Sequence, residues 1–259
     1  MALDCATFSL GGEAASLAYY ISRRKGSFFL IGASMILNLK NKRVCDVDIY
    51  LDSIKLKEVD RYKYLGLTIT KNLNWNAHLS DISTKISPMI GAIRRCSNQL
   101  NNQARNLVYK SFIEPYFRYL IPCWGNLPNY LTEKIQRTQN KAIKITFSLD
   151  YFTPSNIVYK TTKLFNISKL RKLEQIKYIF SIQHNLLKSQ SKLQQNLNFH
   201  NYSTRTKDFL RNKYVRTSIC QRSPIFESIN AINSVPPSVF CDVSYNVMCH
   251  NLKKYLSSI

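Results

Sequence analysis

The chain has 259 residues, and its 45% hydrophobic content excludes disorder throughout and is enough for one large domain or two small ones. Lys and Arg total 37 against 15 Asp and Glu, which gives a formal net charge of +22. Such an excess of cations attracts polyanions, which are either nucleic acid or an anionic membrane surface.

The sequence disfavours both a membrane anchor and a metal centre. The apolar run Phe28–Leu37 is much shorter than the roughly twenty residues that span a bilayer, so it predicts a buried strand. The seven cysteines form no Cys-x-x-Cys pair and the four histidines are scattered. We therefore predict no metal site and no cofactor, and ordinary buried thiols in a reducing intracellular compartment, either nucleus or cytoplasm. The positive charge is expected to face nucleic acid.

The first part of the chain predicts β structure. Residues 1–24 match no pattern and are either a poorly ordered leader or an artefact of the reading frame. Apolar and charged residues alternate from Ile49 to Val59, and the interruption at Asp52-Ser53 predicts a hairpin. Tyr62–Ile69 alternates again and predicts a strand that ends in a turn.

After Trp75 the hydrophobic period changes to that of a helix. Pro88 is expected to kink or split the first helix, which ends near Cys96. A second helix is predicted from about Gln103 to Phe112. Trp124 and the neighbouring tyrosines are interpreted as core, and the alternative is a surface on which a base could stack. The inward face of the first helix is predicted to consist of Leu79, Ile82, Ile86, Ile90 and Ile93.

A third predicted helix, Leu131–Phe147, carries a row of cations: Lys134, Arg137, Lys141 and Lys144. Spacings of three, four and three place these side chains on one helix face, where they can follow several phosphates. The like charges repel one another by a few tenths of a kcal/mol per neighbouring pair unless an anion neutralises them. The alternative is that they merely solvate the helix.

A fourth helix is predicted over Lys169–Leu187 with Ser168 as its N-cap and Leu187 facing inward. Residues 188–201 are rich in Gln, Ser and Asn and predict a linker or long loop, and a short basic helix is expected at Leu252–Leu256. The exposed side of the fourth helix is expected to add a second group of phosphate-binding cations: Lys169, Arg171, Lys172 and Lys177.

Motifs of catalysis are missing from the sequence. It has no Gly-rich phosphate loop, no Gly-x-Ser-x-Gly and no His-Glu-x-x-His. Nucleotidyl transfer needs adjacent carboxylates that hold two metal ions, and no Asp-Asp pair occurs. Asp46 and Asp48 could share a strand face, but charged residues beside a hairpin are common. We therefore predict no catalytic residue.

Several short motifs resemble, in order and spacing, the segment after the palm in reverse transcriptases of LINE-type non-LTR retrotransposons. The resemblance covers about 230 residues, from about Lys25 onward. Two positions depart from the family pattern, Lys25-Gly26 in place of a Lys-Thr pair and Ile232–Pro236 in place of Trp-Asn-x-Leu-Pro. The matching motifs are Phe28–Gly32, Lys63–Gly66, Leu73–Trp75 with His78, Tyr119–Gly125, Ile135-Gln136, Gln139–Ala142, Thr204-Arg205, Arg216-Thr217, Ser223-Pro224 and Leu252–Leu256.

The resemblance implies a mainly α fold with a small N-terminal antiparallel β unit, an α+β class with a helical thumb-like bundle. Tyr64, Leu65 and Gly66 would belong to the primer grip and approach the primer backbone, since a glycine lets phosphate come close. Residues 1–24 would be a divergent leader, 25–76 the primer-grip-like unit, 77–188 the thumb-like domain and 189–259 a C-terminal region. Mg²⁺ is expected only with the palm, which has no counterpart here.

The resulting hypothesis is a truncated reverse-transcriptase-like protein that binds RNA or DNA, as duplex or hybrid, through phosphates and does not polymerise by itself. One alternative is a piece of a complete RNA-directed DNA polymerase whose upstream part is missing. Another is a decayed mobile-element relic without activity. The oligomeric state and the preference between RNA and DNA are left open.

Overall fold

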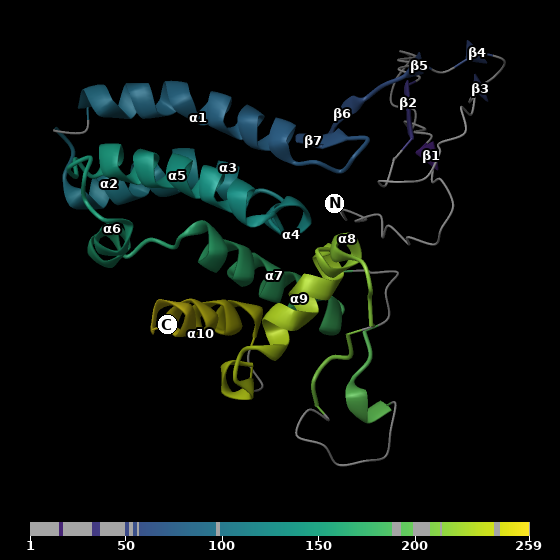
Figure 1. Ribbon diagram of the computed structural model, residues 1–259. Helices are drawn as coiled ribbons and strands as arrows, with labels where there is room; N and C mark the ends of the chain where they lie inside the picture. Colours follow the sequence, from purple (N-terminus) through teal and green to yellow (C-terminus); the bar gives the residue numbers. More distant parts are fainter. Residues whose placement is uncertain are drawn as a thin grey trace, which may run out of the picture. The chain divides into compact units, whose positions relative to one another are not determined.

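The computed structural model describes residues 59–96, 99–187, 193–198, 208–212, 214–240 and 244–258, together with the backbone of five short strands nearer the N-terminus. The chain forms two compact units, Leu10–Thr84 and Lys85–Ile259. The first contains the strands and the second is helical, which confirms the predicted mainly α fold with a small β unit (Figure 1). Some predictions concern residues outside the described ranges. These residues are the leader 1–24, apart from one short strand, together with Asp46, Asp48, Thr204 and Arg205.

The short strands of the smaller unit pair in two groups. β1 (Ser16–Leu17) pairs antiparallel with β2 (Ala33–Ile36), and β2 pairs in parallel with β5 (Lys57–Glu58). β3 (Tyr50–Leu51) and β4 (Ile54–Lys55) pair antiparallel across positions 52 and 53. The hairpin predicted at Asp52-Ser53 is therefore confirmed, and a strand does lie within Phe28–Leu37.

The strand predicted over Tyr62–Ile69 is instead a hairpin, so that prediction is wrong. β6 (Arg61–Tyr64) pairs antiparallel with β7 (Leu67–Thr70), with Tyr64 opposite Leu67. Leu65 and Gly66 form the two-residue connection, and their φ angles of 46° and 84° are both left-handed. Two successive left-handed residues give the turn whose twist matches that of an antiparallel hairpin.

Helix α1 (Asn76–Cys96) runs without interruption through Pro88, so the predicted split does not occur. The boundary between the two compact units falls within this helix. The predicted inward face is confirmed, because all five of its apolar side chains are at most 7% exposed. The 3.6-residue period of the apolar positions was enough to identify this face.

The second predicted helix contains three consecutive segments. These are α2 (Asn102–Val108), the π-helical turn η2 (Tyr109–Ile113) and α3 (Glu114–Arg118). Its core is formed by Tyr109, Ile113 and Phe117. Leu107 and Phe112 of the same helical stretch are 68% and 57% exposed. A π turn adds a residue to the helical turn and so shifts the inward face.

A short helix, α4 (Ile121–Trp124), follows and confirms the interpretation of Trp124 as core. The Trp124 side chain is fully buried, and its Nε1 donates to the carbonyl oxygen of Tyr119 at 2.8 Å. Gly125 comes next, and a Cβ atom there would lie 2.5 Å from the carbonyl oxygen of Ile121. The Trp-Gly pair of the recognised motif therefore serves packing at this corner.

Helices α5 (Asn129–Thr146), α6 (Ser155–Thr162) and α7 (Ile167–Gln183) complete the middle of the larger unit. The side chain of Asn166 accepts from the backbone N–H of Lys169 at 2.8 Å, so the N-cap of α7 is Asn166 and the prediction of Ser168 is wrong. The helix also ends earlier than predicted. Asn185 is left-handed, and the N–H of Leu186 donates to the carbonyl of Ser181, which closes the helix in a Schellman motif. Leu187 lies beyond this end and is 39% exposed, not inward.

Among the C-terminal elements, α9 (Pro224–Asn233) and α10 (Tyr245–Ser258) pack on α7, which also contacts α3, α4 and α5 (Figure 1). The shorter elements are η3 (Asn196–Asn198), α8 (Ser218–Gln221), which contacts α9, and η4 (Pro237–Val239), which contacts α10. Ile176 and Ile179 of α7 form one cluster with Ile229 of α9 and with Met248 and Leu252 of α10. Helix α10 is longer than the predicted Leu252–Leu256. The predicted domain boundaries remain predictions.

A buried polar network joins α5 to its neighbours. The fully buried Gln139 donates through Nε2 to the hydroxyl of Tyr109 at 3.1 Å and to the carbonyl oxygen of Phe165 at 2.8 Å. Its Oε1 accepts from the hydroxyl of Tyr159 at 2.9 Å, and the backbone N–H of Ile167 donates to Oε1 of Gln136 at 3.1 Å. Burial raises the pKa of both tyrosine hydroxyls, so they stay neutral.

We predict that Gln139→Leu lowers the free energy of unfolding by about 2 kcal/mol, because the Tyr109 hydroxyl and the Phe165 carbonyl lose the hydrogen bonds that Gln139 donates, whereas the Tyr159 hydroxyl keeps its bond to Asn140. Urea denaturation followed by circular dichroism measures this change. Gln103→Leu, on the exposed face of α2, is the matched control and is expected to change stability by less than about 0.5 kcal/mol. Equal effects of the two substitutions would show that the network contributes nothing.

Candidate nucleic-acid interface

The cation row predicted on the third helix lies on α5, opposite its buried face. Lys134, Arg137 and Lys141 are exposed, whereas Leu131, Ile135 and Ala142 of the same helix are buried. Arg137 lies 3.5 Å from the carboxylate of Glu133, but both side chains are largely exposed, so the pair is weak. These three cations are open to an external anion.

Lys144, the fourth member of the row, has partners within the chain. Its Nζ donates to the carbonyl oxygen of Tyr151 at 2.6 Å and lies 5.7 Å from the centroid of the Tyr151 ring. Ser148 makes this approach possible, because its left-handed backbone turns the chain back at the end of α5. Lys144 therefore fixes the following loop and is half-buried.

The cations of α7 do not lie on an exposed side as predicted. Lys169, Arg171, Lys172 and Lys177 are all half-buried, because α7 is packed against helices on several faces. Lys177 pairs with Glu174 at 3.0 Å with its side chain only 13% exposed. The Arg171 Nη1 donates to the carbonyl oxygen of Gly125 at 3.0 Å. Arg171 and Lys177 thus have structural contacts that the helical period alone could not reveal.

The predicted primer-grip residues form the tip of the β6–β7 hairpin. Leu65 is 49% exposed and Gly66 is exposed, while Tyr64 is half-buried. Leu65 adopts its left-handed backbone although its Cβ atom makes that conformation costly by about 1 kcal/mol. An exposed leucine held in a strained turn is a candidate contact residue.

Contacts to the first turns of α1 hold this hairpin. The backbone N–H of Thr68 donates to Nδ1 of the buried His78 at 3.4 Å, and the Thr68 hydroxyl donates to a carboxylate oxygen of Asp81 at 2.5 Å. The rings of Trp75 and His78 meet edge to face with centroids 6.2 Å apart. The recognised Trp75 and His78 therefore position the hairpin, whereas sequence reasoning missed Asp81.

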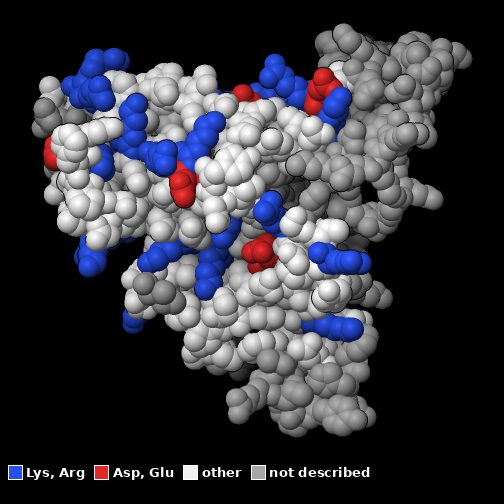
Figure 2. All heavy atoms as spheres, in the orientation of Figure 1, with Lys and Arg blue, Asp and Glu red and all other residues white. Residues whose placement is uncertain are grey.

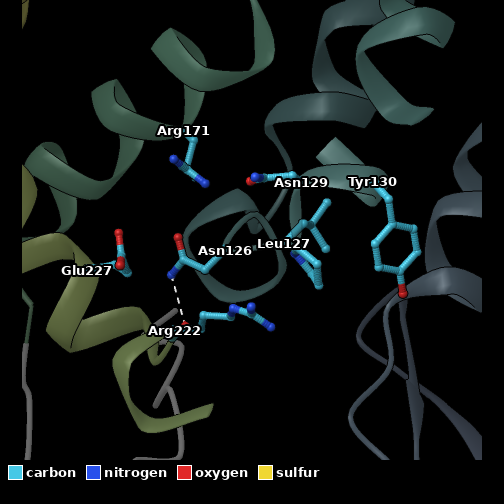
Figure 3. Close-up of a pocket in the computed structure, with 8 residues that line it drawn as sticks. Asn126, Leu127, Asn129, Tyr130, Arg171, Arg222 and Glu227 are labelled. Atoms are coloured by element: carbon cyan, nitrogen blue, oxygen red, sulfur yellow. Dashed lines mark hydrogen bonds between the residues drawn. The ribbon is translucent and has the colours of Figure 1, made fainter. Parts of the chain in front are cut away.

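A polar pocket of about 420 Å³ lies where α5, α7 and α9 approach one another (Figure 3). Asn126 spans it, since its Nδ2 donates to the carbonyl oxygen of Arg222 at 3.1 Å and its Oδ1 accepts from Gln175 at 2.8 Å. The other residues that line the pocket are Leu127, Pro128, Asn129, Tyr130, Arg171 and Glu227. Sequence reasoning missed this pocket because its walls are about 100 residues apart in the chain.

Two carboxylates of the larger unit form ion pairs with cations of the same unit. Arg118 lies 2.6 Å from Glu174 and 3.2 Å from Glu114, which links α3 to α7. Burial alone would lower the pKa of Arg118, but the two carboxylates outweigh it and raise that pKa. On the face drawn in Figure 2, the described Lys and Arg side chains are spread among few Asp and Glu. This distribution favours contact with a polyanion.

Two further sequence predictions concern groups that the structure describes only in part. Cys96 is exposed and Cys123, Cys220 and Cys249 are half-buried, so the prediction of buried thiols is wrong for these four. Within the described ranges, His, Cys, Asp and Glu do not gather in groups of three that could hold a metal ion. No described helix is both long enough and apolar enough to cross a membrane.

Two curated relatives match about half of this chain. The probable RNA-directed DNA polymerase from transposon X-element of Drosophila melanogaster is 21% identical over 126 residues, which are 48% of this chain and 14% of that protein. The probable RNA-directed DNA polymerase from transposon BS of the same fly is 23% identical over 134 residues, 51% of this chain and 15% of that protein. The chain thus covers about one seventh of these relatives. No family model and no solved structure matches. The similarity supports a reverse-transcriptase-like region.

We predict that Leu65→Asn stabilises the β6–β7 hairpin by about 1 kcal/mol, because asparagine tolerates the left-handed conformation that leucine resists. Slower amide hydrogen exchange at Tyr62 and Ile69 would report this gain. Leu65→Ala lacks the short polar side chain that lets asparagine hydrogen-bond locally in this conformation, so it is expected to bring no gain. Faster exchange in the asparagine variant would mean that the leucine side chain, rather than the backbone, decides the stability of the turn.

Proposed function

We propose that this chain is the part of a non-LTR retrotransposon reverse transcriptase that follows the catalytic palm, and that it binds nucleic acid through phosphates. The exposed row Lys134, Arg137 and Lys141 on α5 carries this proposal. The two transposon polymerases similar to half of the chain support it, as does the net charge of +22.

The geometry of the row suits a phosphate backbone. Seven residues separate Lys134 from Lys141, which is about 10 Å along the helix axis at 1.5 Å per residue. Double-stranded DNA carries one negative charge per roughly 1.7 Å of its axis, so a row of this length meets several phosphates. Binding also removes the mutual repulsion of the cations. Contacts of this kind carry no sequence information, so binding is expected to be independent of sequence.

The β6–β7 hairpin is proposed to support a primer end. Its tip presents Leu65 and Gly66, and Gly66 allows backbone to approach a phosphate without an intervening side chain. The contacts of Thr68 with His78 and Asp81 fix the direction of the hairpin relative to the start of α1. A rigid support of this kind lowers the entropic cost of holding a primer in place.

A complete polymerase is the second candidate function, favoured by the chain's 14% and 15% coverage of its relatives. In that case a longer protein supplies the metal-binding carboxylates, and the residues described here grip the product duplex. The two candidates share the same α5 surface. They differ in whether this chain, as given, can extend a primer.

We predict that the triple variant Lys134→Gln, Arg137→Gln, Lys141→Gln binds an RNA/DNA hybrid duplex more weakly and with a shallower salt dependence. Each lost phosphate contact lowers the slope of log K against log salt by about 0.9 for a B-form duplex, so the slope is expected to fall by about 2 to 3. Fluorescence anisotropy titrations at several salt concentrations measure it.

The matched control for this prediction removes three exposed cations elsewhere: Arg216→Gln, Lys253→Gln, Lys254→Gln. It has the same net charge as the triple α5 variant, so the long-range field changes equally. If both variants lose the same slope, the α5 row has no special role and only total charge matters.

We further predict that the purified chain, with Mg²⁺, a primed template and deoxynucleotides, does not extend the primer, because its sequence holds no Asp-Asp pair. A gel assay with a competent reverse transcriptase as positive control measures this. Extension that disappears in Asp46→Asn, Asp48→Asn would contradict the proposal and identify these two carboxylates as metal ligands.

A further inference from the structure

We propose that Tyr151 and Phe152 form a stacking platform for the bases of unpaired nucleotides. These two residues, the aromatic pair, lie in the loop that follows the α5 cation row. The inference rests on the proposed function and deepens it, since it adds contact with single-stranded segments to contact with phosphates.

The aromatic pair is strongly exposed. Tyr151 is 76% and Phe152 is 84% exposed, and their rings meet edge to face with centroids 5.4 Å apart. Adjacent exposed aromatic rings leave apolar surface in water, which marks a contact site more often than chance. The buried Trp124, by contrast, has no surface to offer to a base.

The loop that carries the aromatic pair is held by its own backbone. The N–H of Leu149 donates to the carbonyl of Lys144 at 2.8 Å, which closes the end of α5. The N–H of Phe152 donates to the carboxylate of Asp150 at 3.0 Å, and α6 begins three residues later at Ser155, directly after Pro154. A preorganised loop loses little entropy when a ligand binds, so the exposed rings are presented at low cost.

Charge decides which partner the aromatic pair suits. Lys144 places an ammonium 5.7 Å from the Tyr151 ring and continues the exposed row on α5. A nucleotide combines an anionic phosphate with a flat base, and exposed rings beside cations recognise both together. The carboxylate of Asp150 opposes the field, but it accepts the N–H of Phe152 and so faces the backbone. The surroundings therefore favour nucleic acid over a protein partner.

The test compares two short fluorescent strands of equal length, oligodeoxyadenylate and a strand without bases. We expect Tyr151→Ala, Phe152→Ala to weaken binding of oligodeoxyadenylate on the order of tenfold, and to leave binding of the abasic strand unchanged. Tyr151→Leu, Phe152→Leu keeps apolar side chains without flat rings and is expected to lose as much. Tyr214→Ala removes another exposed tyrosine, 92% exposed, and is expected to change neither strand. A circular dichroism melt of each variant checks that the fold is kept.

Three outcomes would overturn the platform. Equal loss on both strands would show that the rings act only through phosphate contacts. Unchanged binding of oligodeoxyadenylate, while the triple α5 variant still shows a reduced salt slope on duplex, would remove the platform and leave the proposed function intact. Self-association of the wild-type chain that the alanine variant abolishes, with oligodeoxyadenylate binding unchanged, would make the aromatic pair a protein contact. If the wild-type chain binds neither strand nor duplex, the proposed function itself fails.

Discussion

The buried amide of Gln139 is the constraint on which the helical unit depends. Its hydrogen bonds reach η2 through Tyr109, α6 through Tyr159 and the segment before α7 through the carbonyl of Phe165. Because Gln139 is fully buried, it must keep these hydrogen-bond partners: an unsatisfied polar group in the core costs about 1–3 kcal/mol. The network therefore fixes the rotation of α5 about its axis. The cations of α5 point outward because the amide of Gln139, on the opposite face of the helix, points inward.

The same requirement for satisfied partners explains why few of the predicted cations are open. Lys177 shares Glu174 with Arg118 in the partly buried contact between α3 and α7, and Arg171 donates to the carbonyl oxygen of Gly125. A buried or half-buried charge must be paired or hydrogen-bonded, so cations on a central helix become structural. Of the predicted cations, Lys134, Arg137 and Lys141 stay exposed, because they lie opposite the buried face of α5. The surface that can meet a polyanion is thus set by packing, not by the number of Lys and Arg residues.

Sequence periodicity predicted the features that depend on one element at a time. The buried face of α1 follows from apolar residues repeating at the helical period, and the short hairpin at Asp52-Ser53 follows from alternation. Periodicity gave wrong or no predictions for features that depend on contacts between two elements. A leucine at a left-handed position gives no turn signal, so the reversal at Leu65-Gly66 appeared as one strand. The pocket around Asn126 and the half-burial of α7 depend on contacts between distant segments. The roles assigned to the turn and to the cations remain predictions.

Phosphate contacts and base stacking respond differently to salt, so the proposed roles of the α5 row and of the aromatic pair complement each other. Three open cations give an attraction that falls steeply as salt displaces them, because that attraction comes from counterion release. Stacking on a ring involves no ion exchange and persists when the field is screened. A surface with only the first kind of contact would release its ligand at moderate salt. Placing Tyr151 and Phe152 beside Lys144 adds a contribution that survives there, and both depend on the turn at Ser148 that joins the row to the loop.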